Sequence, residues 1–246
     1  MKQRTRLNGC LLAVAALVPA ALADQIDIGN VTYGYGRWQT GNGGEFTFTP
    51  VNPSGWVNNS VYGTGAKNID VAGSFQSFCI EGGETIQPYP EDPPPYNAAL
   101  NHNAVWGGVG PTGDAISVGT GWLYSQFARG VWTPGLSYDY TNTGIGRHKS
   151  AAALQNAIWW LEGENGLGYD SGNIYEAAVV ALFGSEAAAK ADGGWLYGVW
   201  ALNLTNPTTG ARAQDGLIYI PDGGTTLMLL GMATSGLAVI ARRRKE

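Results

Sequence analysis

Cysteine and histidine are both scarce in this chain of 246 residues. Its two cysteines are Cys10 and Cys79, and its two histidines are His102 and His148. Two cysteines cannot build the disulfide framework on which many small secreted domains depend. The histidines lack further cysteine or histidine ligands at the spacing of a zinc site. We therefore expect no metal site and no cofactor.

Charged residues are also few, at 13% of the chain. Seven of the 14 Lys and Arg residues and two of the 19 Asp and Glu residues lie in the terminal segments 1–23 and 220–246. The remaining body has 7 basic and 17 acidic residues, and thus a net charge of −10. Such an acidic body argues against nucleic acid and against anionic lipid surfaces as partners.

Catalytic signatures are missing as well. The G-x-S-x-G motif of a serine hydrolase does not occur. The glycines of Gly34–Gly36 and Gly63–Gly65 lack the strand-turn-helix setting of a phosphate-binding loop. A secreted hydrolase is therefore the least favoured of the functions considered, and we expect that the chain is not an enzyme.

Glycine and aromatic residues are abundant, with 37 Gly, 9 Trp, 12 Tyr and 6 Phe. This composition is typical of a β-rich extracellular module with many turns. No glycine-serine linker divides residues 24–219, and about 200 residues suffice for one large domain. We predict the α+β class, with a β-rich sandwich or barrel part packed intimately against a helical part.

Residues 1–23 have the pattern of a secretory signal peptide. A basic start precedes the short apolar run Leu11–Val18 and a small-x-small cleavage site at Ala21–Ala23. An uncleaved anchor is the alternative, but the apolar run is short for a bilayer span. Because Cys10 lies in this signal, Cys79 is the one cysteine expected in the exported body. A lone exported cysteine implies a partner thiol, an inert buried thiol or a special bond.

Residues 220–246 have a three-part pattern. Pro221, Asp222 and Gly223 precede an apolar run from 225 to 241, which barely spans a bilayer, and a basic cluster from 242 to 245. This tail resembles the PEP-CTERM class of sorting signals, closest to the variant that begins Val-Pro-Asp-Ser-Gly. The resemblance implies an exosortase as partner, transient anchoring by a transmembrane helix, and delivery to the bacterial cell surface or extracellular matrix. A plain single-pass anchor is the alternative.

The first half of the body is predicted to consist mostly of strands. Residue character alternates as in a strand in three segments, Val31–Tyr35, Gly44–Thr49 and Phe75–Ile80. The segment Gly41–Gly44 is typical of a hairpin turn. Cys79 would then end a buried strand.

The second half is predicted to hold three helices, at 114–129, 150–162 and 173–191, followed by closing strands at 195–204 and 217–220. Ser150 is a candidate cap for the middle helix. Gln155, Trp159 and Glu162 share one of its faces, so an amide is held at a fixed point on a rigid element.

Two of these segments resemble the thioester domain of bacterial surface adhesins. Phe78-Cys79-Ile80-Glu81 has an aromatic residue before the cysteine and an aliphatic and a polar residue after it, as in that family. Leu154–Trp159 matches the family segment Thr-Gln-x-Ala-Ile-Trp except at Leu154. Tyr124–Ala128, which contains Gln126, is a loose match to a third motif. The resemblance covers roughly residues 75–164.

The resemblance implies a thioester-domain-like fold for residues 24–219 and an internal thioester between Cys79 and Gln155. The Cys79 thiolate attacks the Gln155 side-chain amide and ammonia leaves; an external amine on a surface target can then attack the stored bond. The result is covalent attachment that is used once, without turnover.

Further residues are expected to support such a bond. The bond would be protected from water by the aromatic side chains of Phe78, Trp159 and Trp160. A proton would be transferred by Glu81 or Glu162. Gln126 would lie near the bond. The main alternative keeps the fold without the bond, as a matrix component or a glycan-binding module with exposed Trp and Tyr platforms.

Overall fold

The computed structural model describes residues 24–28, 38–40, 43–51, 74–84, 95–105, 113–141 and 145–220. The predicted signal peptide, the predicted strand Val31–Tyr35 and the sorting tail from residue 221 onward lie outside these ranges. Within the ranges, no helix combines the length and the apolar character needed to cross a membrane.

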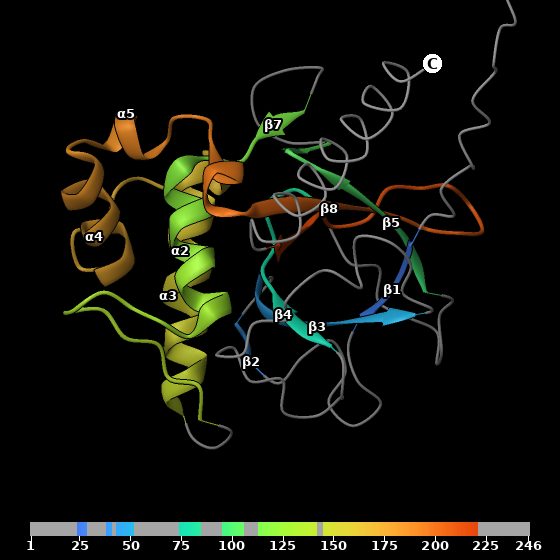
Figure 1. Cartoon of the computed structure of the whole chain (residues 1–246), viewed down its shortest axis with the longest axis horizontal. Helices are drawn as coiled ribbons and strands as arrows, with labels where there is room; N and C mark the ends of the chain where they lie inside the picture. The colour runs from blue at the N-terminus through green and yellow to red at the C-terminus, as the bar shows by residue number, and fades with distance from the viewer. Residues whose placement is uncertain are drawn as a thin grey trace, which may run out of the picture.

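The described chain is mixed in secondary structure, which confirms the α+β class. Figure 1 shows the strands gathered on one side and the helices on the other, with α2 and α3 running side by side between the strands and α4. The strands are β1 (Asp24–Ile28), β2 (Trp38–Thr40), β3 (Gly43–Val51), β4 (Phe75–Ser77), β5 (Tyr96–Asn101), β6 (Asn103–Ala104), β7 (Asp114–Ala115), β8 (Val199–Thr205) and β9 (Gly216–Tyr219).

The main sheet is antiparallel and its two ends meet. Its order is β2-β3-β1-β5-β8-β9, and β4 pairs with β3. The chain just after β4 then pairs with β9, because Cys79 bridges Gly216 and the Ile80 N–H donates to the Asp215 carbonyl over 3.1 Å. Ser77 adds a side-chain link, since its hydroxyl bonds both backbone groups of Leu217 at 2.8 Å. The strands therefore form a closed ring, which leaves little exposed edge.

Two apolar cores lie on the two faces of this ring. Alternate residues of β1, β3, β5, β8 and β9 form one core that includes Cys79. The opposite faces of β8 and β9, together with Phe78 and Ile80, pack against the helices in the other core. Because side chains alternate along a strand, Cys79 faces one core and its two neighbours face the other.

The helical part covers the outer face of the ring. Its elements are α2 (Val118–Arg129), α3 (Ile145–Glu162), η1 (Glu164–Gly166), α4 (Ile174–Phe183), α5 (Glu186–Ala189) and η2 (Gly194–Tyr197). α3 lies against β2 and β3 as well as α2. It thereby joins the two parts of the fold.

Several predicted helix boundaries were wrong. α3 begins at Ile145, and the Ser150 hydroxyl accepts from the Asp139 N–H instead of capping the helix. α2 begins at Val118 because Ser117 caps it, and the residues before it pair as β7. The helix predicted at 173–191 is split at Gly184, whose φ of 86° ends α4.

The predicted closing strand at 195–204 was also wrong at its start. It opens with the 3-10 turn η2, and Gly198 in the left-handed region separates that turn from β8. The hairpin prediction at 41–44 is supported by the pairing of Thr40 with Gly43 across β2 and β3.

Candidate functional site

Gln155 lies in the middle of α3 with a buried side chain that reaches the ring. Its Oε1 accepts from the Gly44 N–H over 3.0 Å and from the Cys79 N–H over 3.1 Å. Its Nε2 donates to the Cys79 carbonyl over 2.8 Å. The structure thus brings together the two residues that the sequence singled out, through three hydrogen bonds.

The carboxamide takes the place of a strand-strand pair. In the β3–β4 ladder, Phe46 is opposite Ser77 and Phe48 is opposite Phe75. Continuing this register by two residues would place Gly44 opposite Cys79. There the two backbone N–H groups converge on Gln155 Oε1 instead.

Cys79 is a free, buried cysteine with 2% of its surface exposed. Burial raises the pKa of its thiol well above the ordinary range, and the nearby Glu84 carboxylate raises it further. The thiol is therefore neutral at neutral pH and needs a base before it can act as a nucleophile.

Trp159, one of the predicted wall residues, packs close to this region. Its ring packs against the core that contains Cys79. It also lies over Gly43, where an added Cβ would come within 2.4 Å of the Trp159 ring and 2.9 Å of Gln155 Cγ. Its buried indole N–H has no hydrogen-bond partner among the described residues.

The two other predicted wall residues face the helical core. Phe78 packs edge-on against Phe127, with ring centroids 5.0 Å apart. Trp160 lies beside Tyr169 and under the Lys190 ammonium, 4.8 Å from its ring centroid. Phe78 therefore anchors the segment that carries Cys79, whereas Trp160 stabilises the helical layer.

Glu81 is 2% exposed, and neither of its carboxyl oxygens has a hydrogen-bond partner in the described part of the chain. Burial and the neighbouring Glu84 and Asp215 raise its pKa to about 9. The pKa of Glu84 is raised to about 7, and that of Asp215 to about 6, mainly by burial. Glu81 is thus a buried, largely protonated acid two residues from Cys79.

Glu162 is the last residue of α3, two turns beyond the Cys79–Gln155 pair. Its Oε1 accepts from the Ser117 hydroxyl over 2.8 Å and from the Ser117 N–H over 3.2 Å. Seven residues of helix separate it from Gln155, roughly 10 Å along the axis. This carboxyl fixes the start of α2, and the structure gives it no place beside Cys79.

Gln126 is buried near the end of α2 and bonds locally. With its amide oriented to satisfy both ends, it donates to the Val131 carbonyl and accepts from the Arg129 guanidinium. It is not brought to the Cys79–Gln155 pair. Pro221, Asp222 and Gly223 of the predicted sorting motif lie outside the described residues.

Sequence reasoning missed a buried ion pair next to the site. Arg147 of α3 and Glu45 of β3 are both 0% exposed and are joined by two hydrogen bonds. A signal was available, since Arg147 is one of only seven cations in a body of about 200 residues. Its partner could not be read from the sequence because 102 residues separate the two.

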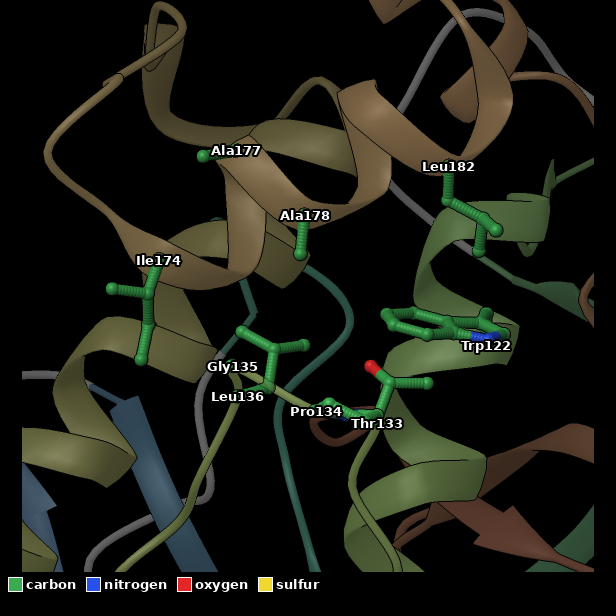
Figure 2. A pocket seen from close by; sticks show the side chains of 9 residues that line it. All are labelled: Trp122, Thr133, Pro134, Gly135, Leu136, Ile174, Ala177, Ala178 and Leu182. Carbon is green, nitrogen blue, oxygen red and sulfur yellow. The ribbon is translucent and has the colours of Figure 1, made fainter.

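A separate hollow of about 550 Å³ lies on the outer side of the helical part. Figure 2 shows Ile174, Ala178 and Leu182 projecting into it from α4, opposite Trp122 and Leu136. None of the predicted site residues lines it.

The described residues contain no group of three or more His, Cys, Asp or Glu side chains arranged to hold a metal ion. Comparison of the chain with protein families, with curated proteins and with solved structures found no match.

Proposed function

We propose that this chain is an exported surface or matrix protein in which Cys79 and Gln155 form an internal thioester for covalent attachment to amine-bearing targets. The observation that carries the proposal is the placement of the Gln155 carboxamide. Two backbone N–H groups hold its oxygen, and one of them belongs to the cysteine itself. This arrangement resembles an oxyanion hole.

The proposed chemistry follows from that placement. Cys79 Sγ bonds to Gln155 Cδ, and negative charge develops on Oε1 in the tetrahedral intermediate. The Gly44 and Cys79 N–H groups already point at this oxygen, so they stabilise the charge as it forms. The bond from Cδ to Nε2 then breaks and ammonia leaves, carrying the proton that the thiol gives up.

The neighbouring acids are suited to move that proton. Glu84, with a pKa of about 7, is partly ionised at neutral pH and lies close enough to Cys79 to affect its thiol. Glu81, with a pKa of about 9, stays largely protonated and can act as an acid toward the leaving nitrogen. We assign the proton transfer to these two residues rather than to Glu162.

The stored bond reacts once. An external amine attacks Cδ, the Cδ–Sγ bond breaks, and an amide remains on residue 155 while the Cys79 thiol regains a proton. Trp159 over Gly43 limits the access of water before the target arrives. The export part of the proposal, with exosortase sorting to a bacterial cell surface or matrix, rests on the sequence patterns of residues 1–23 and 220–246.

Amine treatment tests the proposal. The purified chain without residues 1–23, and therefore without Cys10, is incubated with methylamine, and its mass and its free thiol are followed together. We expect a gain of one methylamine and the appearance of one alkylatable thiol in the unfolded product, with neither change in the Cys79→Ala variant. A thiol that is fully alkylatable before methylamine is added would rule the thioester out.

One observation favours the non-reactive alternative, a glycan-binding module. His102 stacks on Trp195 with ring centroids 5.1 Å apart and contacts Trp200 at a tilt with centroids 4.1 Å apart, and Trp195 is 37% exposed. An exposed aromatic ring can stack on the apolar face of a sugar. Retention on polysaccharide gels that is lost in Trp195→Ala, from a protein without a thioester, would favour this function.

A further inference from the structure

The buried ion pair between α3 and β3 adjoins the Gln155 site. Glu45 directly follows Gly44, whose N–H binds the Gln155 oxygen. Arg147 Nε donates to Glu45 Oε2 over 2.8 Å, and Arg147 Nη2 donates to Glu45 Oε1. The Tyr138 hydroxyl donates to the same Oε2 over 2.6 Å. The carboxylate is therefore held both from α3 and from the segment between α2 and α3.

Stability alone is a weak reason for such a pair. Burying two charges costs their hydration, and apolar residues of similar volume are often as stabilising or more so. Polar groups are kept in a core where they fix a register. Here the ion pair fixes the register of α3 against β3. The position of the Gln155 carboxamide depends on that register.

We propose that Glu45 and Arg147 are positioning residues that hold the Gln155 carboxamide against the Gly44 and Cys79 N–H groups. α3 is anchored at two points on adjacent residues of β3, by Arg147 on Glu45 and by Gln155 on Gly44. The two anchors are eight residues apart, roughly 12 Å along the helix. Two separated anchors fix the height and the rotation of a rigid helix, whereas one leaves it free to turn.

The expected effect on the rate of thioester formation rests on the proposed function. The claim that the ion pair positions the Gln155 carboxamide does not. A misplacement of about 1 Å at a reacting centre can slow a reaction roughly 100-fold. The hydrogen bond from Gly44 to Gln155, in contrast, is present with the carboxamide intact and Cys79 free. Amide exchange at Gly44 therefore reports the position of the carboxamide by itself.

The first test measures hydrogen exchange in the Cys79→Ala chain, with and without the paired change Glu45→Leu and Arg147→Met. Removing both charges avoids leaving one of them buried and unpaired. We expect the Gly44 amide to exchange about tenfold faster, as befits a lost hydrogen bond, while the Ile26 amide in β1 is unchanged. Unchanged Gly44 exchange in a folded pair variant would overturn the proposal. If the pair variant does not fold, Arg147→Lys takes its place, because lysine keeps the charge but cannot make the two parallel hydrogen bonds. The Gly44 amide must then also exchange faster.

A matched control removes the other buried polar pair of α3. The change Ser117→Ala with Glu162→Leu disrupts the far end of the helix and leaves Arg147 in place. We expect Gly44 exchange to stay as in the parent. A similar acceleration in this control would mean that general loosening of α3, rather than the ion pair, sets the position of Gln155.

The second test follows loss of ammonia by intact mass after cell-free synthesis of the chain with Cys79 present. We expect the Glu45→Leu/Arg147→Met variant to lose ammonia roughly 100-fold more slowly than the wild type. Equal rates would overturn the link to chemistry. A wild type that never loses ammonia would refute the proposed function, while the exchange result still decides the positional claim.

Discussion

Gln155 and Glu162 lie on one helix and are both buried, yet the two parts of the fold use them differently. In the helical part, Glu162 accepts from the Ser117 hydroxyl and N–H and thereby fixes the start of α2. In the ring, Gln155 accepts from the N–H of Gly44 in β3 and from that of Cys79 just after β4, and donates back to Cys79. Glu162 completes an ordinary helix cap. Gln155 replaces a strand pair and is bonded to both backbone groups of the only cysteine in the described residues.

The largest effect is expected when the two buried glutamines of the helical part are removed one at a time. We expect Gln155→Ala to abolish labelling by a biotinylated amine, because no electrophile can form. Gln126→Ala removes a buried glutamine that bonds only within its own turn, and labelling should persist. Streptavidin blotting of the two purified variants measures the effect. Labelling that survives in Gln155→Ala would show that another group carries the reactivity.

Gly43→Ala should have the next largest effect. Its Cβ would meet the Trp159 ring at 2.4 Å and Gln155 Cγ at 2.9 Å, so both side chains must shift. We expect a loss of about 1–3 kcal/mol in the free energy of unfolding, with slower formation of the thioester. Urea denaturation and intact mass report the two effects. Trp159→Leu, which shortens the obstructing side chain, should restore part of the stability, and a Gly43→Ala chain with parental stability and mass would contradict the packing.

Ser117→Ala tests the role assigned to Glu162. It removes the α2 cap and one hydrogen bond to Glu162, so we expect a loss of about 1 kcal/mol in stability. Amine labelling should not change, because this end of α3 has no part in the chemistry. A fall in labelling that exceeds the fraction unfolded would place Glu162 in the mechanism after all.

A further prediction concerns the dependence of stability on pH. The pKa of Glu81 rises from 4.5 to about 9 on folding, so the folded chain keeps a proton that the unfolded chain releases. Stability must therefore fall as the pH rises through this window. Glu81→Gln cannot release that proton, so we expect its unfolding temperature to fall less between those pH values. Because Glu84 and Asp215 shift in the same direction, a residual slope should remain. Parallel curves for the two chains would show that Glu81 is not a buried acid.

The sequence predicted the local part of this structure well. Alternation marked β3 and β4, and helical spacing marked α2 and α3. The pairing of Cys79 with Gln155 came from motif resemblance, and the hydrogen bonds between them agree with it.

What the sequence could not predict depends on distant residues. The Glu45–Arg147 pair and the closure of the ring at Cys79 and Gly216 join segments more than 100 residues apart. No local pattern shows that Glu162 has a partner in Ser117, so its role was assigned from its helix face alone. Similarly, α3 begins five residues before Ser150, and its first turn carries Arg147, whose buried partner Glu45 is distant in sequence.

The central claim is that Cys79 and Gln155 are chemically joined, and the intact mass of the chain without residues 1–23 tests it most directly. The chain is purified without strong nucleophiles and compared with its Cys79→Ala variant. We predict a native mass lighter than the sequence by one ammonia, and no such deficit in the variant. A native mass equal to that of the sequence, with Cys79 freely alkylated once the chain is unfolded, would contradict the account.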